Sequence, residues 1–226
     1  KYFENNDDTS ASQTTQSFYG IWDKNLASLT SFDRDDLLQQ EILEEINLDG
    51  DEDDDYRITS DNPIDWSTNM GWYIDLINTE GGNTDNKGER QISASILRDG
   101  RIIFTTMMPE DNPCSAGGTG WLMELDARDG SRLAFSPFDI NDDNAFDEDD
   151  YIQATVDVNG DGTVDENDKV PPSGTKSEVG IIPMPAILSG EEEYKYTPGT
   201  TGDIQTTTEN PGPGSTGRQS WRELDF

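Results

Sequence analysis

Two acidic loops near the middle of the chain carry oxygen-bearing side chains at the spacing of a calcium site. The clearer one, 157–168, reads DVNGDGTVDEND and has Gly162 at its position 6. In an EF-hand loop this glycine permits a sharp turn, and position 7, here Thr163, offers its backbone carbonyl. The spacing therefore predicts a Ca²⁺ site. The oxygen-bearing side chains at loop positions 1, 3, 5, 9 and 12 are Asp157, Asn159, Asp161, Asp165 and Asp168.

The other loop, 139–150, reads DINDDNAFDEDD and follows the same template. Its position 7 is Ala145, which would offer a carbonyl, and its position 6 is Asn144, which tolerates a positive φ less readily than glycine does. Only residues 151–156 separate the two loops, too few for the helices of paired EF-hands. We therefore expect residues 139–168 to be an insertion in another fold. The side chains at positions 1, 3, 5, 9 and 12 are Asp139, Asn141, Asp143, Asp147 and Asp150.

The composition argues against several classes of partner and reaction. The chain has 226 residues, a formal net charge of −33 and no histidine. This charge repels nucleic acid and anionic membranes, and no apolar run is long enough to span a bilayer. Without histidine, Ser–His, Cys–His and histidine-ligated zinc sites are excluded within this chain. We expect no enzymatic activity. Cys114 stands alone, so no disulfide can form within the chain.

Short apolar runs separated by turns predict an all-β fold. Gln91–Met107 reads as a hairpin around Asp99–Gly100, and Trp121–Asp126 leads through a turn to Ser131–Phe135 as a second one. Helical spacing of apolar residues predicts one short helix over Asp33–Ile46. Two prolines confine Val179–Leu188 to an edge or irregular strand. Residues 191–217, rich in Gly, Thr, Pro and Glu, are expected to form a flexible loop.

Several sequence blocks, in order, resemble the C-terminal domain of the PilY family, the tip-associated adhesin and assembly proteins of bacterial type IV pili. They span nearly the whole chain. The blocks are SFYGIWD (17–23), DLLQQ (36–40), YRITSDNPIDW (56–66), GWYIDL (71–76), GER (88–90), NPCSAGGTGWLMELDARDG (112–130), FDIN (138–141) and SWREL (220–224).

The resemblance implies a modified β-propeller, of which residues 1–226 would supply the later blades. The chain lacks an initiator Met and the long N-terminal region of the family, which suggests a piece of a larger protein. The resemblance also implies a calcium site in the loop that begins with FDIN. Expected partners are minor pilins at the pilus tip, the N-terminal part of the same protein and a surface or host receptor. The expected location is the cell surface, reached through the periplasm, with roles in pilus assembly, attachment and twitching motility.

Two other functions stay open. WLMELDARDG at 121–130 resembles a repeat of quinone-dependent dehydrogenase propellers, although the chain contains it only once clearly. Paired DxNxD loops are also typical of dockerins, which are calcium-dependent binding modules. A dockerin needs a helix after each loop, and the prolines in Val170–Gly174 disfavour one there.

Overall fold

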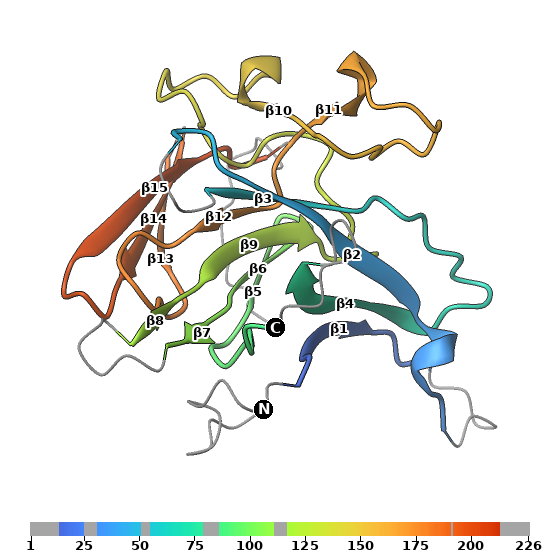
Figure 1. Cartoon of the computed structure of the whole chain (residues 1–226). Coiled ribbons are helices and arrows are strands. Elements are labelled where there is room, and N and C mark those ends of the chain that lie inside the picture. Colours follow the sequence, from blue (N-terminus) through green and yellow to red (C-terminus); the bar gives the residue numbers. More distant parts are fainter. Residues whose placement is uncertain are drawn as a thin grey trace, which may run out of the picture.

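The computed structural model describes residues 14–24, 31–50, 55–78, 86–110, 117–190 and 192–212. Within these residues the chain is mainly strand, and its helices are the short 3₁₀ turns η2 (Arg34–Asp36), η4 (Glu148–Asp150) and η5 (Glu166–Asp168) (Figure 1). The strands are β1 Ser17–Ile21, β2 Leu38–Ile46, β3 Tyr56–Thr59, β4 Gly71–Asn78, β5 Ile96–Arg98, β6 Arg101–Thr105, β7 Met108–Pro109, β8 Gly118–Thr119, β9 Trp121–Asp126, β10 Ile152–Gln153, β11 Lys169–Val170, β12 Gly174–Lys176, β13 Ala186–Ser189, β14 Glu193–Pro198 and β15 Ile204–Glu209.

Eight strands form the main sheet, in the order β1-β4-β2-β3-β12-β9-β6-β5. Neighbouring strands are antiparallel except β2 and β4, which run parallel. The sheet is strongly curled. The ring centroids of Phe18 in β1 and Phe104 in β6 lie 4.2 Å apart, although five strands separate β1 from β6 in the sheet. The rest of the pairing comprises a three-stranded sheet, β13-β14-β15, and the pairs β10-β11 and β7-β8.

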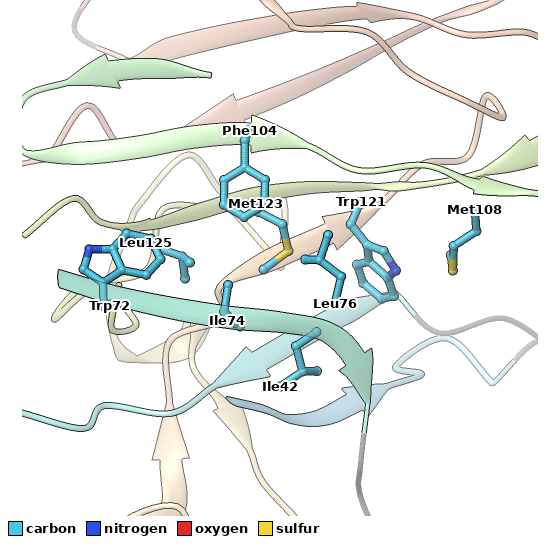
Figure 2. Packing of buried hydrophobic residues seen from close by; sticks show 9 residues of the cluster. All are labelled: Ile42, Trp72, Ile74, Leu76, Phe104, Met108, Trp121, Met123 and Leu125. Carbon is cyan, nitrogen blue, oxygen red and sulfur yellow. The ribbon is translucent and has the colours of Figure 1, made fainter. Parts of the chain in front are cut away.

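The concave side of the curled sheet encloses the largest apolar cluster (Figure 2). Alternate residues of a strand point to the same face, so Trp72, Ile74 and Leu76 of β4 lie together opposite residues of β9. The clustered side chains are Ile42, Trp72, Ile74, Leu76, Phe104, Met108, Trp121, Met123 and Leu125. A second cluster, which includes Ile103 and Leu122 from the other face of β6 and β9, packs against Val179 and Ile182. Both faces of this half of the sheet are therefore covered.

The indole of Trp72 lies between two glycines that are distant in sequence. A Cβ atom at Gly20 would stand 2.4 Å from the Trp72 indole, and one at Gly130 would stand 2.2 Å from it. Gly130 also has a φ of 74°, in the left-handed region that glycine adopts most easily. Both positions therefore require glycine for the indole to be buried.

The predicted helix over Asp33–Ile46 is wrong. The structure has one 3₁₀ turn, η2, capped by the side chain of Asp33, and then the nine-residue strand β2. The buried residues of β2 alternate, but Gln40 and Glu44 are polar, so the apolar pattern did not reveal a strand. Their polarity is satisfied inside the fold: Gln40 Nε2 donates to the carbonyl oxygens of Asn62 at 2.9 Å and Asp129 at 3.0 Å.

The flexible loop expected over 191–217 is also wrong for its central part, where β14 and β15 form an antiparallel hairpin. This hairpin buries charged side chains. The Lys195 ammonium contacts the carboxylates of Glu124 and Glu209 and lies 3.4 Å from Glu193 Oε1. Ion pairs, which leave no apolar pattern in the sequence, therefore attach the hairpin to β9 of the main sheet. Residues 213–217 lie outside the described part.

Of the remaining predictions, some are confirmed and one is wrong. The hairpin β5-β6 is confirmed, with Asp99 and Gly100 at φ values of 46° and 82°, as a primed two-residue turn requires. The return strand expected at Ser131–Phe135 is wrong, because no strand forms there. Val179–Leu188 is irregular until β13, an edge strand of the three-stranded sheet, as expected. Cys114 and the SWREL block fall outside the described residues.

Candidate metal-binding site

The two acidic loops lie side by side above one end of the main sheet (Figure 1). Each leads into a two-residue strand, and these strands, β10 and β11, pair antiparallel with Ile152 opposite Val170. Both residues stand two places after the last aspartate of their loop. The loops are therefore related by an approximate two-fold axis that passes near this pair.

Both loops fold around their first aspartate. Asp139 accepts hydrogen bonds from the backbone N–H groups of Asp143, at 3.2 Å, and Asn144, at 2.9 Å. Asp157 accepts in the same way from Gly160 and Gly162, both at 2.7 Å. In each loop one of these bonds joins position 1 to position 6, so the chain curls toward the first carboxylate.

The third and fifth residues repeat a second pattern. The amide oxygens of Asn141 and Asn159 accept from the N–H group two residues further on, at 3.0 and 2.9 Å. The carboxylates of Asp143 and Asp161 do the same, at 2.7 and 2.8 Å. The hydroxyl of Thr163 also donates to Asp161, and its hydrogen bonds hold the pKa of this carboxyl below its usual value. Alternate side-chain oxygens thus turn back toward the loop.

Each loop closes with a 3₁₀ turn and a buried aspartate. Asp147 and Asp165 cap η4 and η5, each in a capping box with the last residue of its loop. That last residue, Asp150 or Asp168, is fully buried and accepts from the N–H group at position 2, at 2.8 and 2.9 Å. Burial raises the pKa of Asp150.

Left-handed backbone occurs at the same places in both loops. Position 6 has a φ of 61° at Asn144 and 88° at Gly162, and position 4 has a φ of 57° at Asp142 and 78° at Gly160. Asn144 therefore adopts the turn that the sequence suggested it could tolerate. Such conformations in residues other than glycine persist only where surrounding interactions enforce them, here the bonds to Asp139.

The donor set fits a hard cation, but the side chains do not converge on a point. Carboxylate, amide and carbonyl oxygens are the ligands that calcium takes. In the described part of the chain, however, no group of three or more Asp, Glu, His or Cys side chains is arranged to hold a metal ion. The side chains at positions 3, 5 and 9 are exposed, so they have room to turn inward.

A residue that sequence reasoning missed attaches the loops to the sheet. Glu44 of β2 accepts from both the N–H group, at 2.9 Å, and the hydroxyl, at 2.6 Å, of Thr155, which lies between the loops. Around this contact, Ile58 of β3 packs with Ile152, Ala154 and Val170. Nothing in the sequence distinguishes Glu44 from neighbouring acids, because its role depends on which face of β2 it occupies.

The tryptophans differ in their burial. Trp72 and Trp121 are buried, and the Arg57 guanidinium lies 4.1 Å from the centre of the Trp121 ring. Trp22 is 45% exposed and meets Trp66 edge to face, with ring centroids 5.1 Å apart. The fifth, Trp221, lies outside the described residues.

These features define the class of protein. It is an all-β, partly closed propeller that carries two paired acidic loops. The chain belongs to the PilY family of type IV pilus proteins. It is 30% identical over its whole length to the type IV pilus biogenesis factor PilY1 of Pseudomonas aeruginosa strain PAO1, of which it spans 19%. It is 34% identical, over 58% of the chain and 8% of the relative, to a PilY1 homolog of Xylella fastidiosa.

A solved structure has the same fold. The crystal structure of the Pseudomonas aeruginosa PilY1 C-terminal domain matches with a TM-score of 0.68 and 25% sequence identity, over 94% of this chain and 40% of that one. The chain thus spans about a fifth of the length of the Pseudomonas aeruginosa relative, less than a tenth of the Xylella fastidiosa homolog and less than half of the solved domain. No protein-family model matches the chain. Among the described residues, no helix is long and apolar enough to cross a membrane.

Proposed function

We propose that this chain is the calcium-binding portion of a type IV pilus biogenesis protein that supports pilus assembly and surface attachment. The observation that carries the proposal is the agreement between the two loops. Positions 1, 3, 5, 9 and 12 of both make corresponding hydrogen bonds, and these are the ligand positions of a calcium loop. Family membership supports the pilus role, and the loops support the ion.

Each loop would hold one Ca²⁺, which supplies positive charge and fixes the positions of the oxygens around it. The side chains at positions 1, 3, 5, 9 and 12 and the carbonyl at position 7 would be the ligands. In the first loop these are Asp139, Asn141, Asp143, Ala145, Asp147 and Asp150, and in the second Asp157, Asn159, Asp161, Thr163, Asp165 and Asp168.

The loops' own charges explain why an ion would matter. Residues 139–168 contain twelve carboxylates and no lysine or arginine, and Lys169 follows just outside. Without a cation the carboxylates therefore repel one another. Calcium would reduce this repulsion and stabilise the paired arrangement. Because Glu44 and the Ile58 cluster connect the loops to β2 and β3, ordering of the loops would also stabilise that part of the sheet. Outside the cell an affinity of about 10⁻⁴ to 10⁻³ M suffices for such a role.

The proposed location and partners follow from the relatives, which are pilus biogenesis factors. We place the protein at the cell surface, at the pilus tip. Its partners would be minor pilins, the N-terminal part of the same polypeptide and a surface or host receptor. Twitching motility would depend on it through pilus assembly.

Calcium titration by calorimetry tests the ion. Asp143→Ala and Asp161→Ala each remove a ligand from one loop, and each should lower the number of bound ions or weaken one site at least tenfold. Glu148→Ala and Glu166→Ala remove an exposed acid at position 10, which is no ligand, and serve as matched controls. Unchanged calcium uptake in both ligand variants would refute the calcium proposal.

Piliation tests the role in assembly. The full-length protein carrying Asp161→Ala should restore fewer surface pili to cells that lack it than the Glu166→Ala protein does. Equal piliation would separate calcium binding from pilus assembly.

The structure disfavours the dockerin alternative, because strands rather than helices follow both loops. A quinone-dependent dehydrogenase gains no support from the comparisons, whose relatives are pilus factors. Absorbance of a bound quinone in the purified protein would be the observation that favours it.

A further inference from the structure

Among the described residues, no strand pairs with the outer edge of β1 in the main sheet. Strand β1 pairs with β4 on one side and is the first strand of the sheet. Trp22 N–H donates to the Met70 carbonyl at 2.8 Å, and Leu76 N–H donates to the Gln16 carbonyl at 2.9 Å. In an antiparallel pair the bonded residues alternate, so the even-numbered residues face β4 and the N–H and C=O groups of Ser17, Tyr19 and Ile21 face away. These outward groups have no hydrogen-bond partner among the described residues.

The residues of β1 themselves lack the features that usually protect an edge strand, although the Arg34 guanidinium donates to the Ser17 hydroxyl at 3.3 Å. Natural edges carry charges, prolines or bulges, or are very short. β1 is five residues long, reads SFYGI, and pairs with β4 without a register shift. The sequence is uncharged although 28% of the chain is charged. Tyr19 and Ile21 are 45% and 48% exposed.

The opposite edge of the same sheet is different. β5 has three residues, and it ends at Arg98. The Arg98 side chain donates to the Ser189 hydroxyl at 2.6 Å and pairs with Glu193, so the three-stranded sheet is tied to this edge. Of the two edges, β1 is the one that the described residues leave ready for another strand.

An apolar hollow continues from the end of β1. It has a volume of about 600 Å³ and is lined by Gly20, Ile21, Trp22, Trp66, Trp72, Ala127 and Arg128. The Lys24 ammonium lies 4.8 Å from the centre of the Trp22 ring and donates to the backbone carbonyl of Trp66 at 2.9 Å, so it connects Trp22 to the Trp66 backbone. A strand beside β1 could therefore place an apolar side chain against Trp22 and Trp66.

The solved domain supplies a candidate occupant. This chain accounts for 40% of that domain, so the same fold contains much more chain than is present here. We propose that β1 is the joint at which a strand from the remaining part of the same polypeptide extends the sheet, with an apolar side chain in the Trp22–Trp66 hollow. The inference rests on the proposed association with the rest of the polypeptide, and it does not depend on calcium.

Hydrogen exchange at single residues tests the joint, by comparing this 226-residue chain with the full-length natural polypeptide. The amides of Ser17, Tyr19 and Ile21 should exchange fast in the shorter chain and roughly tenfold or more slowly in the longer one. The amides of Phe18 and Gly20, which face β4, should be protected in both and serve as an internal control.

Equal exchange of the three outward amides in both proteins would overturn the proposal. If they are fast in both, nothing pairs with β1. If they are slow in both, another segment of this chain or a second copy already covers the edge, and dilution of the shorter chain distinguishes these cases.

A pair of variants gives a second measurement. Tyr19→Lys places a charge on the proposed joint, and Leu97→Lys places one on the opposite edge, where Leu97 is 70% exposed. In the longer polypeptide Tyr19→Lys should abolish the slowing at Ser17 and Ile21, whereas Leu97→Lys should preserve it. The same effect from both variants would contradict the proposal. Repeating the experiment with Asp161→Ala separates the two proposals, since loss of calcium binding alone should leave the β1 pattern intact.

Discussion

Ile152 and Val170 face each other across the β10-β11 pair, each two residues beyond the last aspartate of its loop. Both side chains are buried, against Ile58 of the main sheet. The two loops thus share one apolar base, so a change in the base should affect both loops rather than the nearer one alone.

Truncation at this base should destabilise the protein. Ile152→Ala removes a side chain that is 4% exposed, and we expect the free energy of unfolding to fall by about 2–4 kcal/mol. Urea denaturation measures this change, and calcium titration should show both sites weakened. Leu97→Ala, at an exposed position, is the control and should change stability by less than about 0.5 kcal/mol. Weakening of the first site alone would show that the loops act separately.

Removing the charge of Glu44 should loosen the loops from the sheet. Glu44→Gln keeps one acceptor for Thr155 but places an amide NH₂ where the second acceptor stood. We expect a loss of about 1–3 kcal/mol in unfolding free energy and faster amide exchange at Thr155. Glu41→Gln, on the exposed face of the same strand, is the matched control. A similar loss in both variants would mean that Glu44 acts only through overall charge.

The buried ion cluster predicts that the β14-β15 hairpin depends on Lys195. Burial lowers the pKa of Lys195, and the adjacent Glu124 carboxylate opposes this shift. Lys195→Met leaves Glu124, Glu193 and Glu209 buried beside one cation fewer, and should destabilise the protein by about 3–5 kcal/mol. Thermal unfolding of Lys195→Met and of the exposed control Lys169→Met measures the difference. Equal melting temperatures would show that the cluster contributes nothing to stability.

Because the pKa of Tyr56 is raised in the folded protein, we expect the protein to lose stability at alkaline pH. Burial, then the negative charge of Asp55 and Asp142, raises the pKa of Tyr56 to about 12. The unfolded chain loses this proton near pH 10 and the folded chain retains it, so rising pH favours unfolding through the window from about 10 to 12. The full effect is about 3 kcal/mol, because each pKa unit corresponds to about 1.4 kcal/mol. Tyr56→Phe should remove this part of the slope in urea unfolding measured across the window, while Tyr19→Phe should keep it.

The strands and turns that the sequence predicts correctly are those determined by a short local pattern. The short apolar run of Trp121–Asp126 and the Asp99–Gly100 turn each identify their element within a few residues. The all-β class follows from such runs. The two acidic loops that the ligand spacing singled out share most of their hydrogen bonds. Whether they bind calcium is still a prediction.

The sequence does not reveal elements whose buried residues are polar and have partners far along the chain. Gln40 and Glu44 occupy core positions of β2 because Asn62 and Thr155 satisfy them, and no pattern near β2 indicates those partners. The same reason hides the hairpin around Lys195, which depends on Glu124 some seventy residues earlier. The pairing of β10 with β11 could not be predicted from the sequence either, because two residues are too few to indicate a strand.

The packing of the Trp72 indole between two glycines has a genetic consequence. Gly20 and Gly130 approach the same indole from separate parts of the chain, so a bulkier residue at either position must displace it. Once the ring has moved, the second replacement meets little further resistance from it. Alanine at both sites should therefore be less harmful than the sum of the single changes, a case of epistasis between distant glycines that act through one ring.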